Sequence, residues 1–341
     1  MSSDQPIPKT QTAAVIQEFR RPYVLSSEHP VKQASELAPN QCLVKIEYAG
    51  VCHSDLHIRN ADWAVVQPKP PFVGGHEGVG TVVAIGAHSS DHVQLGDRVG
   101  LKWIGNVSYV NYVTPIPEGL DGAAAAPILC AGLTVYKALK QANIIVSQWV
   151  AIGGAGGGLG HLAVQYAVAM GFRVLAIDTG EAKKKLTLGL GAEKWIDFKE
   201  TTNLIQDVKE ATGGAGPDAA IIAAGDAKPF NDALLYLNFK GTLVCVGMPG
   251  GAAMLNAPVP LLIAKDPRLG IISLPDFSAK CVINCRLNTR RSQQDMTEAL
   301  RIAALGKVKC QHQVKPLAEI NQVMDDLEKG SVVGRIVLKV S

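Results

Sequence analysis

The sequence lacks three features that would each indicate a particular class of protein. No uninterrupted apolar run is long enough to span a bilayer, and residues 1–11 do not show the basic-then-apolar pattern of a secretion signal. The 33 Lys and Arg residues nearly balance the 30 Asp and Glu residues, so no basic patch or acidic tail favours nucleic acid or a membrane surface as a partner. The seven cysteines, an odd number spread from Cys42 to Cys310, do not resemble a disulfide framework. We therefore expect a cytoplasmic protein whose cysteines are informative chiefly as metal ligands.

Length and composition indicate a globular protein with more than one domain. A chain of 341 residues is too long for one ordinary hydrophobic core, which favours two domains. Hydrophobic residues make up 47% of the chain and charged residues 18%, as expected of a compact globular protein.

The most informative stretch runs from Trp149 to Gly180. It combines an apolar segment at 150–152, a nearly all-glycine turn at 153–160, helical spacing of apolar residues at 159–170, and a second apolar segment at 173–177 that ends at Asp178. Glycines in such a turn let the backbone approach a pyrophosphate at the start of a helix, and an acid roughly 20 residues further on accepts hydrogen bonds from a ribose. The pattern predicts a dinucleotide site in which Asp178 favours NAD over NADP. The alternative is a turn with only a structural role.

The two halves of the chain show different patterns. Residues 12–50 alternate in short apolar segments broken by Pro, Asn and Gly, which is typical of antiparallel strands. From 149 to 246, short strands at 194–197, 219–223 and 242–246 alternate with helices at about 181–190, 202–211 and 228–239. This alternation predicts an α/β fold with a doubly wound parallel sheet behind a β-rich opening.

Cys52 and His76 are candidate metal ligands in the β-rich part. Taken singly, a cysteine is usually a small buried hydrophobe and a histidine usually a hydrogen-bonded structural residue. However, Glu77 follows His76, and residues 53–57 supply two histidines and an aspartate after Cys52. This density of ionisable groups favours a functional site.

Several longer motifs carry a resemblance to a known family. The segments GVCHSDLH, GGHEG, GDRVGLKW, APILCAGLTVYKALK, GGLG, LAIDTGEAK, VGMP and VVGR together resemble the zinc-containing, NAD-dependent alcohol dehydrogenases of the medium-chain dehydrogenase/reductase superfamily, in particular the fungal, yeast-type branch. The resemblance covers most of the chain. It implies a GroES-like β-rich catalytic domain at 1–131, completed by 285–341, and a Rossmann domain that binds NAD at 132–284.

The resemblance also implies a metal site. Cys52, His76 and Cys130 correspond to the ligands of the catalytic zinc, with Glu77 as an alternating fourth ligand. Two thiolates and one imidazole leave a tetrahedral zinc with one open position, which is the arrangement of a catalytic site.

A further set of residues is implied to contact NAD, from its pyrophosphate through the adenosine to the nicotinamide. Its members are Gly154, Gly157, Gly158, Leu159, Gly160, Asp178, Lys183, Phe198, Val246, Met248 and Arg335. Ordinary core packing is the alternative for Phe198, Val246 and Met248. For Arg335, whose forked donors suit a phosphate, the alternative is a solvated charge at a strand end.

The implied reaction is the oxidation of a small primary alcohol such as ethanol, or its reverse. Zinc lowers the pKa of the alcohol, and the neighbouring carbon gives hydride to the nicotinamide. Ser54 would take the alcohol proton and pass it through the cofactor ribose to His57, while His53 contacts a cofactor phosphate or is a plain surface histidine. Trp63 and Trp103 correspond to bulky positions that narrow the pocket, unless they are core residues.

The chain departs from the family pattern in two places. No cysteine lies between Cys52 and Cys130, so the lobe that holds a second, structural zinc in the family is missing after Asn106. Residues 274–291 are also unlike the family, and Cys281 and Cys285 within them are more simply two ordinary thiols than a metal site. There are two alternatives. One is a zinc-free quinone or enoyl reductase of the same superfamily, against which the presence of Cys52, His76, Glu77 and Cys130 argues. The other is an inactive nucleotide-binding variant, which the two departures keep open. The fungal relatives imply a homotetramer.

Overall fold

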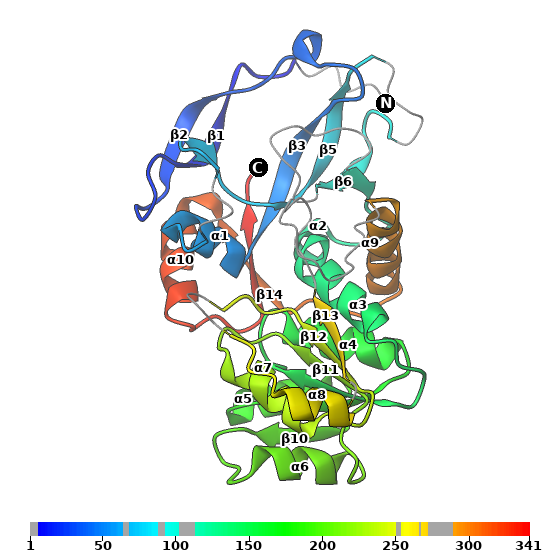
Figure 1. Cartoon of the computed structure of the whole chain (residues 1–341). Coiled ribbons are helices and arrows are strands. Elements are labelled where there is room, and N and C mark those ends of the chain that lie inside the picture. The colour runs from blue at the N-terminus through cyan, green and yellow to red at the C-terminus, as the bar shows by residue number, and fades with distance from the viewer. Residues whose placement is uncertain are drawn as a thin grey trace.

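A six-stranded parallel sheet forms the lower half of the molecule in Figure 1, in the order β10-β9-β8-β11-β12-β13. The structure, a computed structural model, describes residues 6–63, 68–87, 93–101, 113–249, 254–265, 267–271 and 289–341. The strand order reverses between β8 and β11, and ligands of doubly wound sheets bind at the carboxyl ends of strands at such a reversal. The strands and helices of this half are β8 (Trp149–Gly153), α4 (Gly160–Ala169), β9 (Arg173–Asp178), α5 (Glu181–Gly189), β10 (Lys194–Asp197), α6 (Leu204–Ala211), β11 (Ala219–Ile222), α7 (Lys228–Tyr236), β12 (Thr242–Cys245), α8 (Val259–Lys265) and β13 (Arg268–Ile271).

The central strands of this sheet are apolar on both faces because helices cover both faces. Residues 150–152 of β8 and 219–222 of β11 have no exposed surface. Such continuous burial is typical of parallel sheets and explains why these segments show no alternation in the sequence.

Two antiparallel assemblies form the upper half. One is a three-stranded sheet, β2-β1-β4, and the other a six-stranded sheet, β14-β15-β3-β5-β6-β7, in which only β14 and β15 are parallel. Near the C-terminus, β15 pairs with β3, as the red and blue strands of Figure 1 show. The elements are β1 (Thr10–Ile16), β2 (Val24–Pro30), η1 (Ala34–Glu36), β3 (Cys42–Val51), α1 (His53–Asn60), β4 (Phe72–Val73), β5 (Glu77–Ile85), β6 (Arg98–Leu101), β7 (Val113–Pro115), α2 (Gly122–Ala125), η3 (Ala126–Leu129), α3 (Ala131–Gln141), α9 (Thr289–Ala304), β14 (His312–Pro316), η4 (Leu317–Glu319), α10 (Ile320–Glu328) and β15 (Arg335–Lys339).

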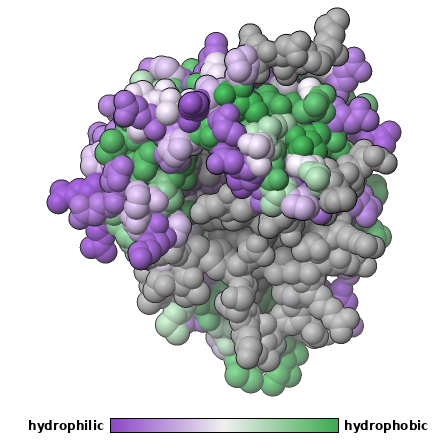
Figure 2. Space-filling view, turned by 90° about the horizontal axis from the view of Figure 1, so that it is seen from above, coloured by the Kyte–Doolittle hydropathy of each residue, from purple (hydrophilic) through white to green (hydrophobic). Residues whose placement is uncertain are grey.

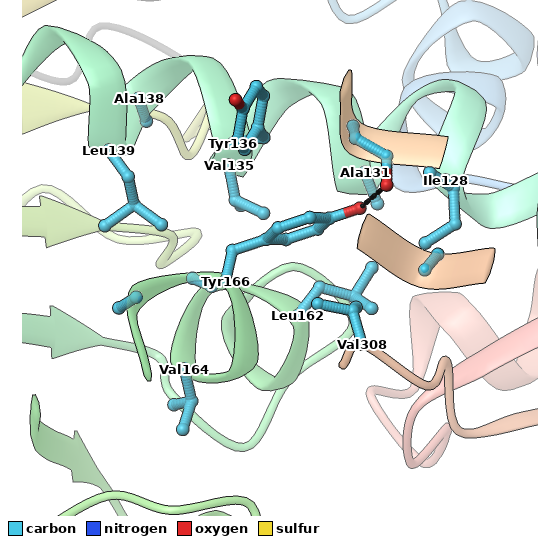
Figure 3. Close-up of a cluster of buried hydrophobic side chains, with 14 of the residues drawn as sticks. Ile128, Ala131, Val135, Tyr136, Ala138, Leu139, Leu162, Val164, Tyr166 and Val308 are labelled. Atoms are coloured by element: carbon cyan, nitrogen blue, oxygen red, sulfur yellow. Dashed lines mark hydrogen bonds between the residues drawn. The ribbon is translucent and has the colours of Figure 1, made fainter. Parts of the chain in front are cut away.

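One hydrophobic cluster joins the two halves. It contains residues of α3, α4, β8 and α9, and it extends to Val79 of β5 and Val337 of β15. Figure 3 shows Tyr166 at its centre, where the hydroxyl donates a hydrogen bond of 2.9 Å to the carbonyl of Ala299. Because the buried phenol has this partner, it lies in the core without an unsatisfied polar atom.

The predicted fold class is confirmed: a β-rich GroES-like part precedes and follows a doubly wound parallel sheet. The predicted helix at 228–239 ends earlier, at Tyr236. The domain boundaries at 131/132 and 284/285 stay predictions. Trp103, Cys281 and Cys285 lie outside the described residues.

No single described helix is long and apolar enough to cross a membrane, whereas Gly122–Leu129 and Ala131–Gln141, bent by 48° at their junction, together meet the criteria of length and composition. Both segments contribute side chains to the buried cluster. Seen from above, the β-rich end shows hydrophilic residues around smaller groups of hydrophobic ones (Figure 2).

Candidate metal centre and cofactor site

Four ligand groups converge where β3 and β5 run side by side. These strands are antiparallel with Gly50 opposite Glu77, so Cys52, just after β3, lies beside His76, just before β5. Cys130 joins them from the residue that precedes α3. The strand pairing thus brings Cys52 beside His76, and the start of α3 adds Cys130, which is 78 residues from Cys52 in the sequence.

The geometry of the four groups fits a tetrahedral metal. One ligand atom from each of Cys52, His76, Glu77 and Cys130 lies within 4.8 Å of the others, and His76 Nε2 is 3.3 Å from Cys130 Sγ. Ligands bound to zinc at about 2.1 and 2.3 Å lie roughly 3.6 Å apart in a tetrahedron. Two thiols, an imidazole and a carboxylate are the donors that zinc prefers, so the residues present fit the metal.

Asp55, in the first turn of α1, orients two of these ligands. Its carboxylate accepts the backbone N–H of Cys52 at 2.9 Å and contacts Nδ1 of His76 at 2.9 Å. The contact with Asp55 fixes the proton of His76 on Nδ1 and leaves the lone pair of Nε2 for the metal.

Electrostatic interactions in the cluster act in opposite directions on its two thiols. The hydrogen bond with Cys130 holds the pKa of Cys52 well below its usual value, and the same contact holds the pKa of Cys130 well above its usual value. Burial opposes the charge on His76, but the adjacent Asp55 carboxylate raises its pKa well above the ordinary value. The contact with Cys130 therefore favours the thiolate form of Cys52, which is the form that binds a metal.

Glu77 occupies the inner wall of the site. It has no exposed surface, and one carboxylate oxygen forms an ion pair with Arg335. Burial raises the pKa of Glu77 to about 7 in spite of the opposing guanidinium. The other oxygen, Oε2, has no hydrogen-bond partner among the described residues, which is what a carboxylate that can turn to a metal would show.

The glycine turn joins β8 to α4 and has the conformation that glycines permit. Gly154 has a φ of 74°, and a Cβ placed on Gly160 would lie 2.0 Å from the carbonyl oxygen of Gly154. Larger residues at these two positions would force the helix away from the strand.

Asp178, at the end of β9, lies against this turn. It is 4% exposed, and its carboxylate accepts the N–H of Gly156 at 2.9 Å and contacts Lys183 Nζ at 2.8 Å. The acid predicted from spacing alone is therefore placed at the glycine turn, with the predicted lysine beside it.

The remaining predicted cofactor residues differ in exposure. Val246 is 7% exposed within the hydrophobic cluster, as the core-packing alternative expects, whereas Phe198 and Met248 are 45% and 39% exposed and are not core residues. Arg335 is 6% exposed, so it is not a solvated strand-end charge. A Cβ placed on Gly158 would lie 3.0 Å from Arg335 Cδ, which puts this arginine between the glycine turn and Glu77.

The predicted proton-transfer residues lie on α1. The hydroxyl oxygen of Ser54 is 3.6 Å from Cys52 Sγ, and His53 is exposed. His57 contacts the Asp62 carboxylate at 2.7 Å through Nδ1, and its ring centroid is 4.9 Å from that of Trp63. Trp63 therefore lies beside the site.

A cavity of about 320 Å³ lies next to the metal ligands without including them all. It is lined mainly by apolar residues of β1, β3 and α10, and reaches Asp55 and His76. Cys52, Cys130 and Trp63 are not among the described residues that line it.

Sequence analysis missed two residues that the structure places in this region. Asp62 contacts His57, and the fully buried His161 contacts the glycine turn. Asp62 lies five residues after His57, and His161 lies one residue after the glycines, so neither spacing matches a known ligand pattern.

A buried Cys-His-Cys pocket beside a glycine turn of the dinucleotide type defines a metal-binding dehydrogenase. Residues 38–140 match the family model described as an alcohol dehydrogenase GroES-like domain, and residues 158–278 match a zinc-binding dehydrogenase model. The chain is 36% identical to alcohol dehydrogenase 1 of Neurospora crassa over 370 residues, with 98% of both chains covered. It is also 36% identical to alcohol dehydrogenase 1 of Emericella nidulans over 368 residues, which covers 98% of this chain and 99% of the relative. The crystal structure of the alcohol dehydrogenase from Aeropyrum pernix superposes with a TM-score of 0.81 at 27% identity, covering 96% and 99% of the two chains.

The chain therefore belongs to the zinc-containing, NAD-dependent alcohol dehydrogenases of the medium-chain dehydrogenase/reductase superfamily. It is an NAD-dependent oxidoreductase with an alcohol dehydrogenase function, as predicted.

Proposed function

We propose that this chain reversibly oxidises small primary alcohols such as ethanol to aldehydes, using one zinc ion per chain. Cys52, His76 and Cys130 hold the zinc, and Glu77 serves as an alternating fourth ligand. The observation that carries the proposal is the convergence of these four groups within 4.8 Å in a buried pocket. Zinc polarises the alcohol oxygen when bound, and NAD accepts the hydride.

The residues of α1 supply the proton path. The Ser54 hydroxyl, beside ligand Cys52, would receive the proton of the alcohol, and His57 would release a proton to water. Asp62 fixes the ring of His57 by binding Nδ1, which leaves Nε2 free to take the proton.

The substrate is small because Trp63 and Trp103 correspond to the bulky positions that narrow the pocket in the family. Trp63 stacks beside His57 at a centroid distance of 4.9 Å. Trp103, which is outside the described residues, is predicted to narrow the pocket further.

Zinc content and turnover of matched cysteine variants test this function. Elemental analysis of the purified protein should give about one zinc per chain, together with ethanol-dependent formation of NADH. Cys130→Ala should lose most of the zinc and all turnover, whereas Cys245→Ala, which removes a thiol on β12 outside the cluster, should retain both. Equal zinc in the two variants would overturn the assigned ligands. Zinc without turnover would leave an inactive nucleotide-binding relative.

We also propose that the chain forms a homotetramer through its parallel-sheet half. On α8, Val259 and Ile263 are 65% and 77% exposed, and the neighbouring strand β13 ends the order of described strands. An apolar helix face beside a strand whose outer edge pairs with no other described strand suits pairing with a second copy. Light scattering should show that Ile263→Glu dissociates the assembly, while Ile145→Glu, at an equally exposed site on the loop after α3, does not. Equal masses for both variants would contradict this interface.

The cytoplasm is the compartment we propose. The five cysteines in the described part of the chain are free thiols, which suits a reducing compartment. Cell fractionation with an antibody to the chain tests this location.

A further inference from the structure

His161, in the first turn of α4, contacts two backbone groups that are distant from each other in the sequence. The side chain has no exposed surface. Nδ1 is 2.9 Å from the carbonyl oxygen of Gly157 in the glycine turn, and Nε2 lies 3.2 Å from the backbone nitrogen of Gln311, just before β14.

These contacts fix the protonation of the ring. A carbonyl oxygen only accepts, so Nδ1 carries the proton, and a backbone N–H only donates, so Nε2 is bare. The imidazole is therefore neutral, with one donor and one acceptor, both used.

Gln311, whose backbone N–H contacts His161, also contacts Arg335. The carbonyl of Gln311 accepts the backbone N–H of Arg335 at 2.8 Å, and the Arg335 guanidinium pairs with Glu77. Gly334 makes this approach possible, because a Cβ there would lie 2.4 Å from the Gln311 oxygen. A continuous path of contacts thus leads from the glycine turn through His161, Gln311 and Arg335 to the metal ligand Glu77.

The attachment of α4 to this segment does not depend on His161 alone. Gln165, one turn later, donates to the carbonyl of Lys309 at 3.0 Å and accepts its N–H at 2.7 Å. Leu162 and Val308 belong to the same buried cluster, and Figure 3 shows them next to each other. His161 differs from Gln165 and Leu162 in that its side chain also contacts the glycine turn.

We infer that His161 is a positioning residue that holds the glycine turn in register with Arg335 and so sets the affinity for the pyrophosphate of NAD. This inference rests on the proposed role of the glycine turn in cofactor binding. The turn presents its amides to the pyrophosphate, and Arg335 reaches the same turn from β15. If the turn shifts relative to Arg335, its amides and the guanidinium can no longer bind the two phosphates together.

Binding measurements on three variants test the inference. Fluorescence titration gives the Kd for NADH, and calorimetry gives the Kd for ADP-ribose, which carries the pyrophosphate, and for AMP, which carries one phosphate. His161→Leu should weaken NADH and ADP-ribose roughly 10-fold and AMP less, as expected for the loss of one or two buried hydrogen bonds. His161→Gln, whose amide can bond the Gln311 N–H, should recover most of the affinity.

Gln165→Leu is the matched control. It removes the other polar attachment of α4 to residues 309–311 without touching the glycine turn, so it should lower the Tm while leaving the Kd for NADH within about 2-fold. If His161→Leu likewise lowers only the Tm, His161 has a purely structural role and the inference is overturned.

Two further outcomes are also decisive. Should His161→Leu fail to fold, His161→Asn replaces it, because Asn retains a donor near Gly157 but does not reach Gln311. It should then bind NADH more weakly than His161→Gln, and equal affinities would overturn the inference. If the wild-type protein binds neither NADH nor ADP-ribose, the cofactor site itself is wrong and the inference fails with it.

Discussion

Glu77 and Arg335 form a buried ion pair that connects the metal pocket to the glycine turn. Their side chains are 0% and 7% exposed, and they are 258 residues apart in the sequence. The strands that carry them, β5 and β15, both pair with β3, so the central strand of the six-stranded sheet sets their separation. A change on either side of this pair is expected to affect the other.

We expect Glu77→Gln to destabilise the protein by about 3–5 kcal/mol, because it leaves the Arg335 guanidinium buried without a counter-charge. Urea denaturation of the purified protein measures the loss. The double variant Glu77→Leu with Arg335→Met removes both charges and should recover most of the stability. If Glu77→Gln alone is as stable as the wild type, the ion pair between Glu77 and Arg335 is not formed in solution.

Arg335→Met should be less harmful than Glu77→Gln at neutral pH. The carboxyl group left behind can become neutral by taking a proton, and burial already raises the pKa of Glu77 to about 7. In this variant the folded state binds the proton that the unfolded state releases, so its stability should fall as pH rises. Unfolding free energies of the variant at several pH values check the sign, and a rise with pH would contradict it.

Asp178→Ala should reduce the preference for NAD. The carboxylate anchors the N–H of Gly156 and is placed for the adenosine ribose, where it would repel the phosphate of NADP. We expect kcat/KM with NAD to fall on the order of 10-fold or more, as for a lost charged hydrogen bond, and the ratio of NAD to NADP use to fall further. Steady-state kinetics with both cofactors measure this ratio. An unchanged ratio would place the ribose elsewhere.

Asp62→Ala should slow alcohol oxidation through His57. Without the contact at 2.7 Å, the His57 ring loses its fixed orientation. We expect kcat/KM for ethanol to fall roughly 10-fold, which is less than the rate factor that general acid–base catalysis typically contributes. Asp62→Asn retains an acceptor oxygen and should lose less. In a His57→Gln background, Asp62→Ala should have no further effect, whereas additive losses would assign Asp62 a role independent of His57.

The neutral state of His161 predicts a pH dependence of stability. Burial lowers its pKa from 6.5 to about 4, so the folded state resists a proton that the unfolded state accepts. The stabilisation is present above the unfolded pKa and is lost as pH falls toward about 4, on the order of 3 kcal/mol in total. The difference in unfolding free energy between the wild type and His161→Gln should therefore shrink over this range, and a constant difference would contradict the assignment.

The position of the cofactor residues could be predicted because most of them lie close together in the sequence. The glycine turn and Asp178 lie within one strand–helix–strand unit, and Lys183 lies in the first turn of the next helix, so short loops leave little freedom and spacing determines position. For Phe198 and Met248 the sequence does not exclude core packing, because a lone apolar residue gives the same pattern whether its side chain is buried or exposed, as these two are.

The metal pocket shows where sequence and structure divide. The residue types and the family motifs identified its four candidate ligands, and the local patterns of apolar residues predicted the two kinds of sheet. Only the tertiary structure decided that Glu77 pairs with Arg335, that His57 pairs with Asp62 and that His161 spans from Gly157 to Gln311. The physical reason is that burial and pairing across strands and helices depend on which distant backbone segments meet, and no local pattern of residues encodes those contacts.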